Sequence, residues 1–199
     1  MSGFQRLIGL TGSIGTGKTT VSRYLADVYQ LPILDADLYA REAVQPGSPI
    51  LATIFCRYGS SVQMPDRTLN RQRLGEIIFN DAEEKRWLEQ QIHPFVRDRF
   101  LSELQQLAEP TIVLAIPLLF EAQMTDLVTE IWVVYCSFEE QVKRLKQRDC
   151  LNRQQAIARI HSQLPIDTKM AAADVVLDNS SSLESLYRQI DQSFKPAKS

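Results

Sequence analysis

The eight residues from Gly12 to Thr19, with the sequence GSIGTGKT, constrain the fold of this chain more than any other stretch. They match GxxxxGK[ST], the phosphate loop of nucleoside triphosphate-binding proteins, at every fixed position. Glycines permit the tight turn that points backbone N–H groups at phosphate oxygens, and the following helix adds its positive N-terminal end. The motif predicts that the chain binds a nucleoside triphosphate.

The side chains of this loop predict individual roles. Lys18 can reach the β- and γ-phosphates, and the hydroxyl of Thr19 can bind Mg²⁺, so we expect Mg²⁺ together with ATP. The residues expected to bind the nucleotide here are Gly12, Ser13, Ile14, Gly15, Thr16, Gly17, Lys18, Thr19 and Thr20.

The surrounding pattern predicts an α/β fold with a parallel sheet. An apolar run over Arg6–Thr11 reads as a buried strand, Thr19–Tyr29 has helical spacing, and Pro32–Leu34 reads as a second strand. A strand, a glycine turn, a helix and a strand in this order form a βαβ unit. We therefore expect a P-loop fold whose parallel sheet is flanked by helices.

A long helical excursion interrupts this series between residues 49 and 109. The helices expected there are Pro49–Tyr58, Arg71–Phe79, Ala82–Ile92 and Pro94–Leu107, with a boundary at His93-Pro94. The later strands expected are Thr111–Ile116, Glu130–Cys136 and Asp174–Leu177, with Asp178 in a loop and a last helix over Leu183–Phe194. Ser137 before Glu140 and Asn152 before Gln155 have the spacing of helix-capping boxes.

Composition excludes several classes of function. The formal net charge of −2 over 199 residues gives no global attraction to nucleic acid or to an anionic membrane. Three separated cysteines and two histidines offer no zinc ligand set, and the apolar runs are too short to span a bilayer. The N-terminus shows no signal-peptide pattern, so we expect a cytoplasmic protein with no nucleic acid, membrane or obligate protein partner.

Among proteins with a phosphate loop, the sequence favours a small-molecule kinase. No Asp has Gly three positions later and no Asn precedes Lys, so the elements of a GTPase switch are missing. Two alternatives stay open. One is a kinase for another acceptor, such as a nucleoside, a nucleoside monophosphate or shikimate. The other is a phosphate-loop module that binds nucleotide as a regulatory switch without making a product.

Asp35 and Asp37 follow the second expected strand, at the sheet edge where the phosphate loop also begins. A carboxylate there can orient an attacking hydroxyl or hold Mg²⁺ through water. We assign Asp37 as the base and Asp35 as a metal partner or helix cap, although one of them could simply cap the next helix.

Six basic residues crowd two short expected helices and predict a lid that clamps phosphates, the alternative being a solvated basic face. Arg144 and Arg148 lie four residues apart on one helical face. The other four are Lys143, Lys146, Arg153 and Arg159.

Taken in order, the motifs resemble the dephospho-coenzyme A kinase family over nearly the whole chain. The matching segments are LTGSIGTGKTTV, LDADLYARE, LNRQRLGEIIF, LEQQIHPFV, PLLFE, QVKRLKQRD and QLPIDTKMAAADVVLDN. The resemblance implies that ATP phosphorylates the ribose 3′-hydroxyl of dephospho-coenzyme A, the final step of coenzyme A synthesis. It also implies a nucleotide-binding core formed by residues 1–37, 111–137 and 166–199, a helical acceptor domain over 38–110 and a lid over 138–165.

The resemblance also implies roles for single residues. Asp37 matches the family's proposed base, and Lys18 and Thr19 match its phosphate-loop positions. Arg144 and Arg148 match the lid, and Asn179 matches the loop by the adenine. We therefore expect Asp37, Lys18 and Arg148 to be catalytic and Arg144 and Asn179 to bind the nucleotide. The recurring positions near the acceptor are Asp37, Arg71, His93, Pro117 and Glu121. His93 could equally be a helix boundary, and Glu121 could hold the acceptor, hold a water-bound Mg²⁺ or simply begin the next segment.

Overall fold

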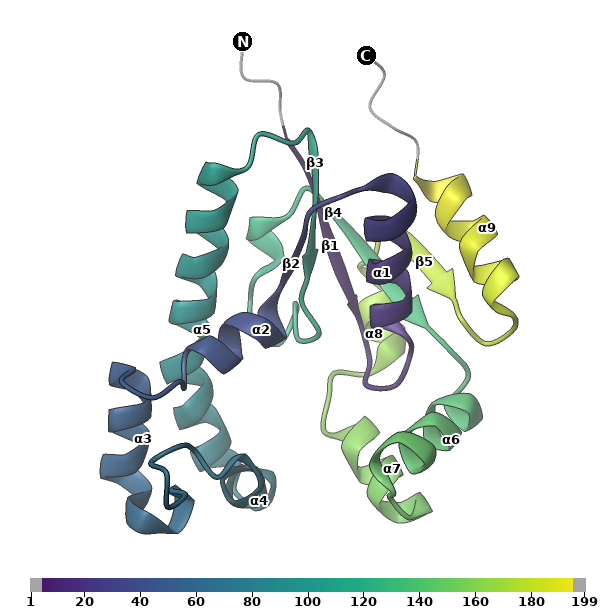
Figure 1. Cartoon of the computed structure of the whole chain (residues 1–199). Helices are drawn as coiled ribbons and strands as arrows, with labels where there is room; N and C mark the ends of the chain where they lie inside the picture. The colour runs from purple at the N-terminus through teal and green to yellow at the C-terminus, as the bar shows by residue number, and fades with distance from the viewer. Residues whose placement is uncertain (1–4, 195–199) are drawn as a thin grey trace. The chain divides into compact units, whose positions relative to one another are not determined.

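The computed structural model describes residues 5–194, in which a five-stranded parallel sheet has the order β2-β3-β1-β4-β5 (Figure 1). The strands are β1 (Arg6–Gly12), β2 (Ile33–Asp35), β3 (Thr111–Ala115), β4 (Glu130–Tyr135) and β5 (Val175–Asp178). Each neighbouring pair is parallel, with β1 between β3 and β4. The expected α/β fold with a parallel sheet is confirmed.

The helices follow the sequence pattern closely. They are α1 (Lys18–Tyr29), α2 (Ala36–Glu42), α3 (Pro49–Tyr58), α4 (Arg71–Asn80), α5 (Ala82–Gln106), α6 (Phe138–Asp149), α7 (Arg153–His161), α8 (Ile166–Ala171) and α9 (Leu183–Ser193), with 3₁₀ turns η1 (Gly59–Val62) and η2 (Thr125–Leu127). Ser137 accepts a hydrogen bond from the Glu140 N–H, and Asn152 forms a complete capping box with Gln155. Both predicted helix starts are confirmed.

The chain divides into two compact units, and the first contains the whole sheet. It comprises the described residues up to Asp35 and those from Ala108 onward. On one face of its sheet, α1 and α9 pack over the buried Trp132, and Tyr24 stacks on Tyr187 with ring centroids 4.1 Å apart. Residues 1–4 and 195–199, at the ends of the predicted nucleotide-binding core, lie outside the described residues.

The second unit, Ala36–Leu107, is helical and has its own core. Ile54, Leu74 and Leu88 lie in that core, with Trp87 packed against it. On its surface the Arg57 guanidinium bonds Glu84 and, with a hydrogen bond from Tyr58, lowers the pKa of Glu84 to about 2. A separate core means that this unit holds its shape through its own contacts.

Two local predictions were wrong. Helix α5 continues through Pro94, where we expected a boundary, because buried Leu88, Val96 and Phe100 anchor the helix on both sides of the proline. Asp178 is the last residue of β5, paired with Tyr135, and does not lie in a loop. None of the described helices is long and apolar enough to cross a bilayer.

Candidate active site

The candidate site lies at the carboxyl edge of the sheet, where ligands bind in open parallel α/β sheets. Strand β1 ends at Gly12 and opens directly into the phosphate loop, while β2 ends at Asp35. Asn179 follows β5, and Pro117 comes two residues after β3. Segments that are distant in the sequence therefore meet around one loop.

Two glycines of the loop occupy positions that no larger residue could take. A Cβ on Gly12 would lie 2.6 Å from the carbonyl oxygen of Val134 in the neighbouring strand. Gly17, the N-cap of α1, has φ of +102°, and a Cβ there would collide with the side-chain amide of Asn179. Close packing around the backbone thus explains the glycines, in addition to the needs of the phosphates.

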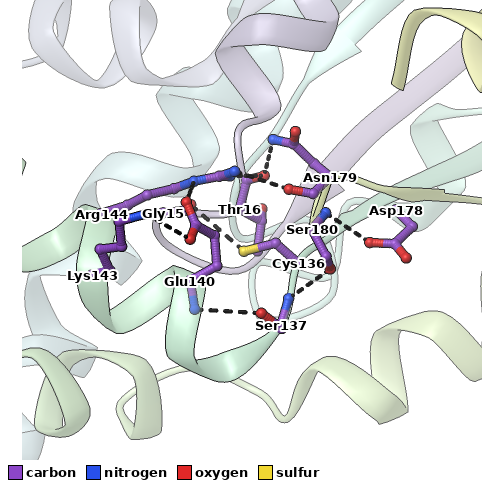
Figure 2. A network of polar contacts seen from close by, with 10 residues as sticks. All are labelled: Gly15, Thr16, Cys136, Ser137, Glu140, Lys143, Arg144, Asp178, Asn179 and Ser180. Atoms are coloured by element: carbon purple, nitrogen blue, oxygen red, sulfur yellow. Dashed lines mark hydrogen bonds and ion pairs between the residues drawn. The ribbon is translucent and has the colours of Figure 1, made fainter. Parts of the chain in front are cut away.

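A polar network joins the end of the loop to β5 and α6 (Figure 2). The side-chain amide of Asn179 donates to the carbonyl oxygen of Thr16 at 2.8 Å. Arg144 donates to the same oxygen at 3.2 Å and to the carbonyl oxygen of Asn179 at 2.9 Å, while Glu140 accepts from its Nε at 3.1 Å. Arg144 and Asn179, both predicted to bind nucleotide, thus lie together against the loop.

Figure 2 also shows the hydrogen bonds that connect the residues at the ends of β4 and β5. The Ser180 hydroxyl accepts from the Ser137 N–H at 2.9 Å, and Asp178 accepts from the Ser180 N–H at 2.8 Å. The Cys136 thiol lies 3.9 Å from the carbonyl oxygen of Gly15. Burial raises the pKa of Cys136 to about 11, so this thiol stays protonated and has a packing role at neutral pH.

A buried ion pair lies beneath the start of the loop, and it joins the predicted Glu121 to Lys169, which was not among the predicted site residues. Lys169 of α8 is fully buried, and its Nζ lies 2.8 Å from Oε1 of Glu121. The same ammonium group makes long hydrogen bonds to the carbonyl oxygens of Gly12, at 3.4 Å, and Pro117, at 3.5 Å. Oε1 of Glu121 also accepts from the Leu164 N–H at 3.0 Å, so the pair connects three segments around the loop.

Lys18 and Thr19 occupy the first turn of α1, where Lys18 is half-buried and Thr19 is exposed. This turn contains no acidic residue, so its positive end is available to an anion. Among residues 5–194, no group of three or more His, Cys, Asp or Glu could hold a metal ion. The hydroxyl of Thr19 and the carboxylate of Asp35 are the hard oxygen donors that suit Mg²⁺ when phosphates and water supply its remaining ligands.

Five of the six basic residues predicted to form the lid pair with acidic neighbours: Lys143, Arg144, Arg148, Arg153 and Arg159. Arg148 makes two hydrogen bonds to Asp149, at 2.8 and 2.9 Å, and Arg159 donates to the same carboxylate at 3.1 Å. The hydrogen bonds from Arg148, with the charge of Arg159, hold the pKa of Asp149 below its usual value. Arg153 pairs with Glu139 in the same way. The structure thus brings Arg144 to the loop and holds Arg148 on Asp149.

Three predicted residues belong to the second unit. Asp37 lies in the first turn of α2, two residues after β2 ends. Arg71 begins α4, and its guanidinium is 3.5 Å from the carbonyl oxygen of Arg41. His93 lies in α5, where burial lowers its pKa, so the ring is neutral at pH 7.

The sequence matches known proteins along most of its length. The model of the family described as Dephospho-CoA kinase matches residues 6–185. A Dephospho-CoA kinase of Trichormus variabilis is 60% identical over 187 residues, which cover 94% of this chain and 95% of that protein. A Dephospho-CoA kinase of a Synechocystis species is also 60% identical, with 94% and 93% covered.

Solved structures give the same picture. A Thermus thermophilus protein superposes with a TM-score of 0.82 at 34% identity, covering 96% of this chain and 97% of its own. A dephospho-CoA kinase from Campylobacter jejuni has a TM-score of 0.70 at 29% identity, with 96% of both chains covered. A shikimate kinase from Bacteroides thetaiotaomicron, at 15% identity and a TM-score of 0.53 with 94% and 95% covered, shares the fold.

Replacing Lys169 by Met should destabilise the protein by about 3 kcal/mol, because the largely shielded charge of Glu121 loses its partner. ADP affinity should also fall, since the carbonyl oxygens of Gly12 and Pro117 lose their donor. Urea unfolding and calorimetric ADP titration measure the two effects. In Lys169→Met combined with Glu121→Met, stability should partly recover while ADP affinity stays low.

The matched control is Lys85→Met, which breaks the partly exposed pair that Lys85 forms with Glu89 at 3.9 Å. Pairs that water can reach contribute little, so the free energy of unfolding should change by less than about 1 kcal/mol. Equal decreases in the free energy of unfolding in Lys85→Met and Lys169→Met would contradict a special role for the buried pair.

Proposed function

The chain belongs to the dephospho-coenzyme A kinase family, and on that premise we propose how its residues transfer the γ-phosphoryl group of ATP to the ribose 3′-hydroxyl of dephospho-coenzyme A. This transfer is the last step of coenzyme A synthesis. The observation that carries the proposal is the intact phosphate loop at the carboxyl edge of the parallel sheet, braced by Asn179 and Arg144. We further propose a cytoplasmic enzyme, in accordance with its use of ATP.

ATP binds through the loop. The backbone N–H groups of Gly15, Gly17, Lys18 and Thr19 donate hydrogen bonds to the phosphate oxygens, and the Lys18 ammonium neutralises charge on the β- and γ-phosphates. Thr19 and Asp35 would hold Mg²⁺, directly or through water, and the ion would neutralise charge on the phosphates. Arg144 lies against the loop and adds positive charge beside the nucleotide.

Asp37 accepts the proton of the ribose hydroxyl and orients the hydroxyl oxygen toward the γ-phosphorus. A ribose hydroxyl is a weak nucleophile at neutral pH, so a positioned carboxylate speeds its attack. Lys18 and Arg148 stabilise the negative charge of the transferring group. For Arg148 this requires exchange of the Asp149 carboxylate for phosphate oxygens, an exchange that conserves the number of charged hydrogen bonds.

We propose separate acceptor-binding roles for residues of the second unit and for the segment after β3. We propose Arg71 for an anionic group of the acceptor and neutral His93 as a hydrogen-bonding partner. Pro117 and Glu121 belong to the segment that Lys169 ties to the loop.

Dephospho-coenzyme A should stimulate ADP release from Mg²⁺-ATP far more than any nucleoside, nucleoside monophosphate or shikimate. A coupled ADP-release assay over this panel makes the comparison. If a nucleoside monophosphate is the best acceptor, the proposed substrate is wrong. If no acceptor stimulates release although ATP binds, the regulatory-switch alternative is favoured.

Asp37→Asn should lower turnover by a factor of roughly 10² to 10⁴, because the amide keeps the shape but not the basicity. ATP affinity should change little, since the loop amides and Lys18 supply most of that binding. Asp35→Asn, assayed in parallel, should show a milder loss that added Mg²⁺ partly restores. Normal turnover by Asp37→Asn with an inactive Asp35→Asn would reverse the two assignments.

Arg148→Ala should lower kcat more than it raises the KM for dephospho-coenzyme A. Its guanidinium meets the phosphoryl group mainly in the transition state, so its loss affects turnover preferentially. Steady-state kinetics with both substrates separates the two effects. Arg188→Ala, an exposed arginine on α9, is the matched control and should keep wild-type kinetics. A change confined to the KM of the acceptor would make Arg148 a binding residue.

A further inference from the structure

The first half of the phosphate loop is held by two glutamine side chains from outside it. Gln141 of α6 is almost completely buried, and its Nε2 donates to Ser13 Oγ at 3.0 Å and to the carbonyl oxygen of Ile14 at 2.5 Å. Oε1 of Gln163, which follows α7, accepts from the Ile14 N–H at 2.7 Å and from Ser13 Oγ at 2.9 Å.

The chemistry of the partners fixes the orientation of both amides. The Ile14 N–H can only donate, so the atom of Gln163 that faces it is the oxygen. The Ile14 carbonyl can only accept, so Gln141 presents its nitrogen. The hydroxyl of Ser13 completes the chain, because it accepts from Gln141 and donates to Gln163. Both backbone polar groups of Ile14 are therefore satisfied from outside the loop.

Apolar packing reinforces the same position. The side chain of Ile14 packs against the small core formed by Val142, Leu145 and Ala156, which joins α6 to α7. Helix α6 also lies directly over Gly15, where a Cβ would be 3.3 Å from Leu145. Residues 13–15 are thus held by α6, α7 and the turn after α7 through both packing and hydrogen bonds.

We propose that Gln141 and Gln163 are positioning residues that hold Ser13 and Ile14 in the conformation that leaves the N–H groups of Gly15, Gly17, Lys18 and Thr19 to the phosphates. Neither glutamine touches the reacting atoms in this role. A loop held in its binding conformation loses less conformational entropy when nucleotide binds. The two glutamines, together called the glutamine clamp below, therefore strengthen nucleotide binding. The inference rests on the proposed nucleotide site but not on the identity of the acceptor.

The test is Gln163→Met, which keeps the approximate volume and removes the accepting oxygen. Calorimetric titration with ADP, in the presence of Mg²⁺, should show a Kd about tenfold higher than for the wild type. The KM for dephospho-coenzyme A should stay within twofold, and the thermal midpoint should fall by only a few degrees. Gln154→Met, on the exposed surface of α7, is the matched control and should leave the Kd unchanged.

Ser13→Ala provides a second variant that removes only one hydroxyl and is expected to fold. It should raise the Kd for ADP by about threefold. In the Ser13→Ala background, Gln141→Met should add less than it does in the wild type, because the two act through one chain of hydrogen bonds. Purely additive effects of the two substitutions on the Kd for ADP would contradict the proposed series of hydrogen bonds.

A Kd for ADP that stays within twofold in both Gln163→Met and Ser13→Ala would overturn the proposal. The proposal would also fail if the Kd for ADP and the KM for the acceptor rose by the same factor while the thermal midpoint fell strongly. That pattern is expected of a residue with a structural role only. If ADP binding weakens as expected but dephospho-coenzyme A is not the acceptor, the proposed role of the glutamine clamp is supported and the proposed function is wrong.

Discussion

A phosphate loop must leave most of its N–H groups to the phosphates, so the protein holds the loop largely by its carbonyl oxygens and side chains. Here the carbonyl oxygen of Thr16 accepts from Asn179 and Arg144, and that of Gly12 accepts from Lys169. All three donors lie beyond β4, far along the chain from the loop they support. The binding conformation of the loop therefore depends on the folding of the C-terminal half.

Two of these donors also carry charge. Arg144 and Lys169 bring positive charge to the loop, and each is paired with a glutamate, Glu140 or Glu121. Each pair is close to neutral overall, so the positive field that an anionic nucleotide meets comes mainly from Lys18 and the N-terminal end of α1, whose first turn has no acidic residue. A buried ion pair rarely gains stability over an apolar pair, but an apolar pair could not donate to the carbonyl oxygen of Gly12. We therefore attribute the Lys169 pair to support of the loop.

Local signals predicted much of this molecule, and contacts across the chain set the rest. The loop and the helix starts at Ser137 and Asn152 depend on residues within a few positions, so their patterns are visible in the sequence. Pro94 misled the prediction because the packing around α5 outweighs the cost of one lost hydrogen bond. Gln163 carries no local signal at all, since it meets Ile14 149 positions away and becomes meaningful only after folding.

The fold restricts the type of reaction more than it restricts the identity of the acceptor. A shikimate kinase has the same fold at 15% identity, so a phosphate loop on this sheet does not by itself choose what is phosphorylated. The side chains that brace the loop here all lie in the unit that contains the sheet, whereas Ala36–Leu107 has its own core. On our proposal that the second unit recognises the acceptor, its surface residues can change, and the acceptor with them, while the supports of the loop stay intact. Such a separation would let one phosphate-binding loop serve kinases with different acceptors.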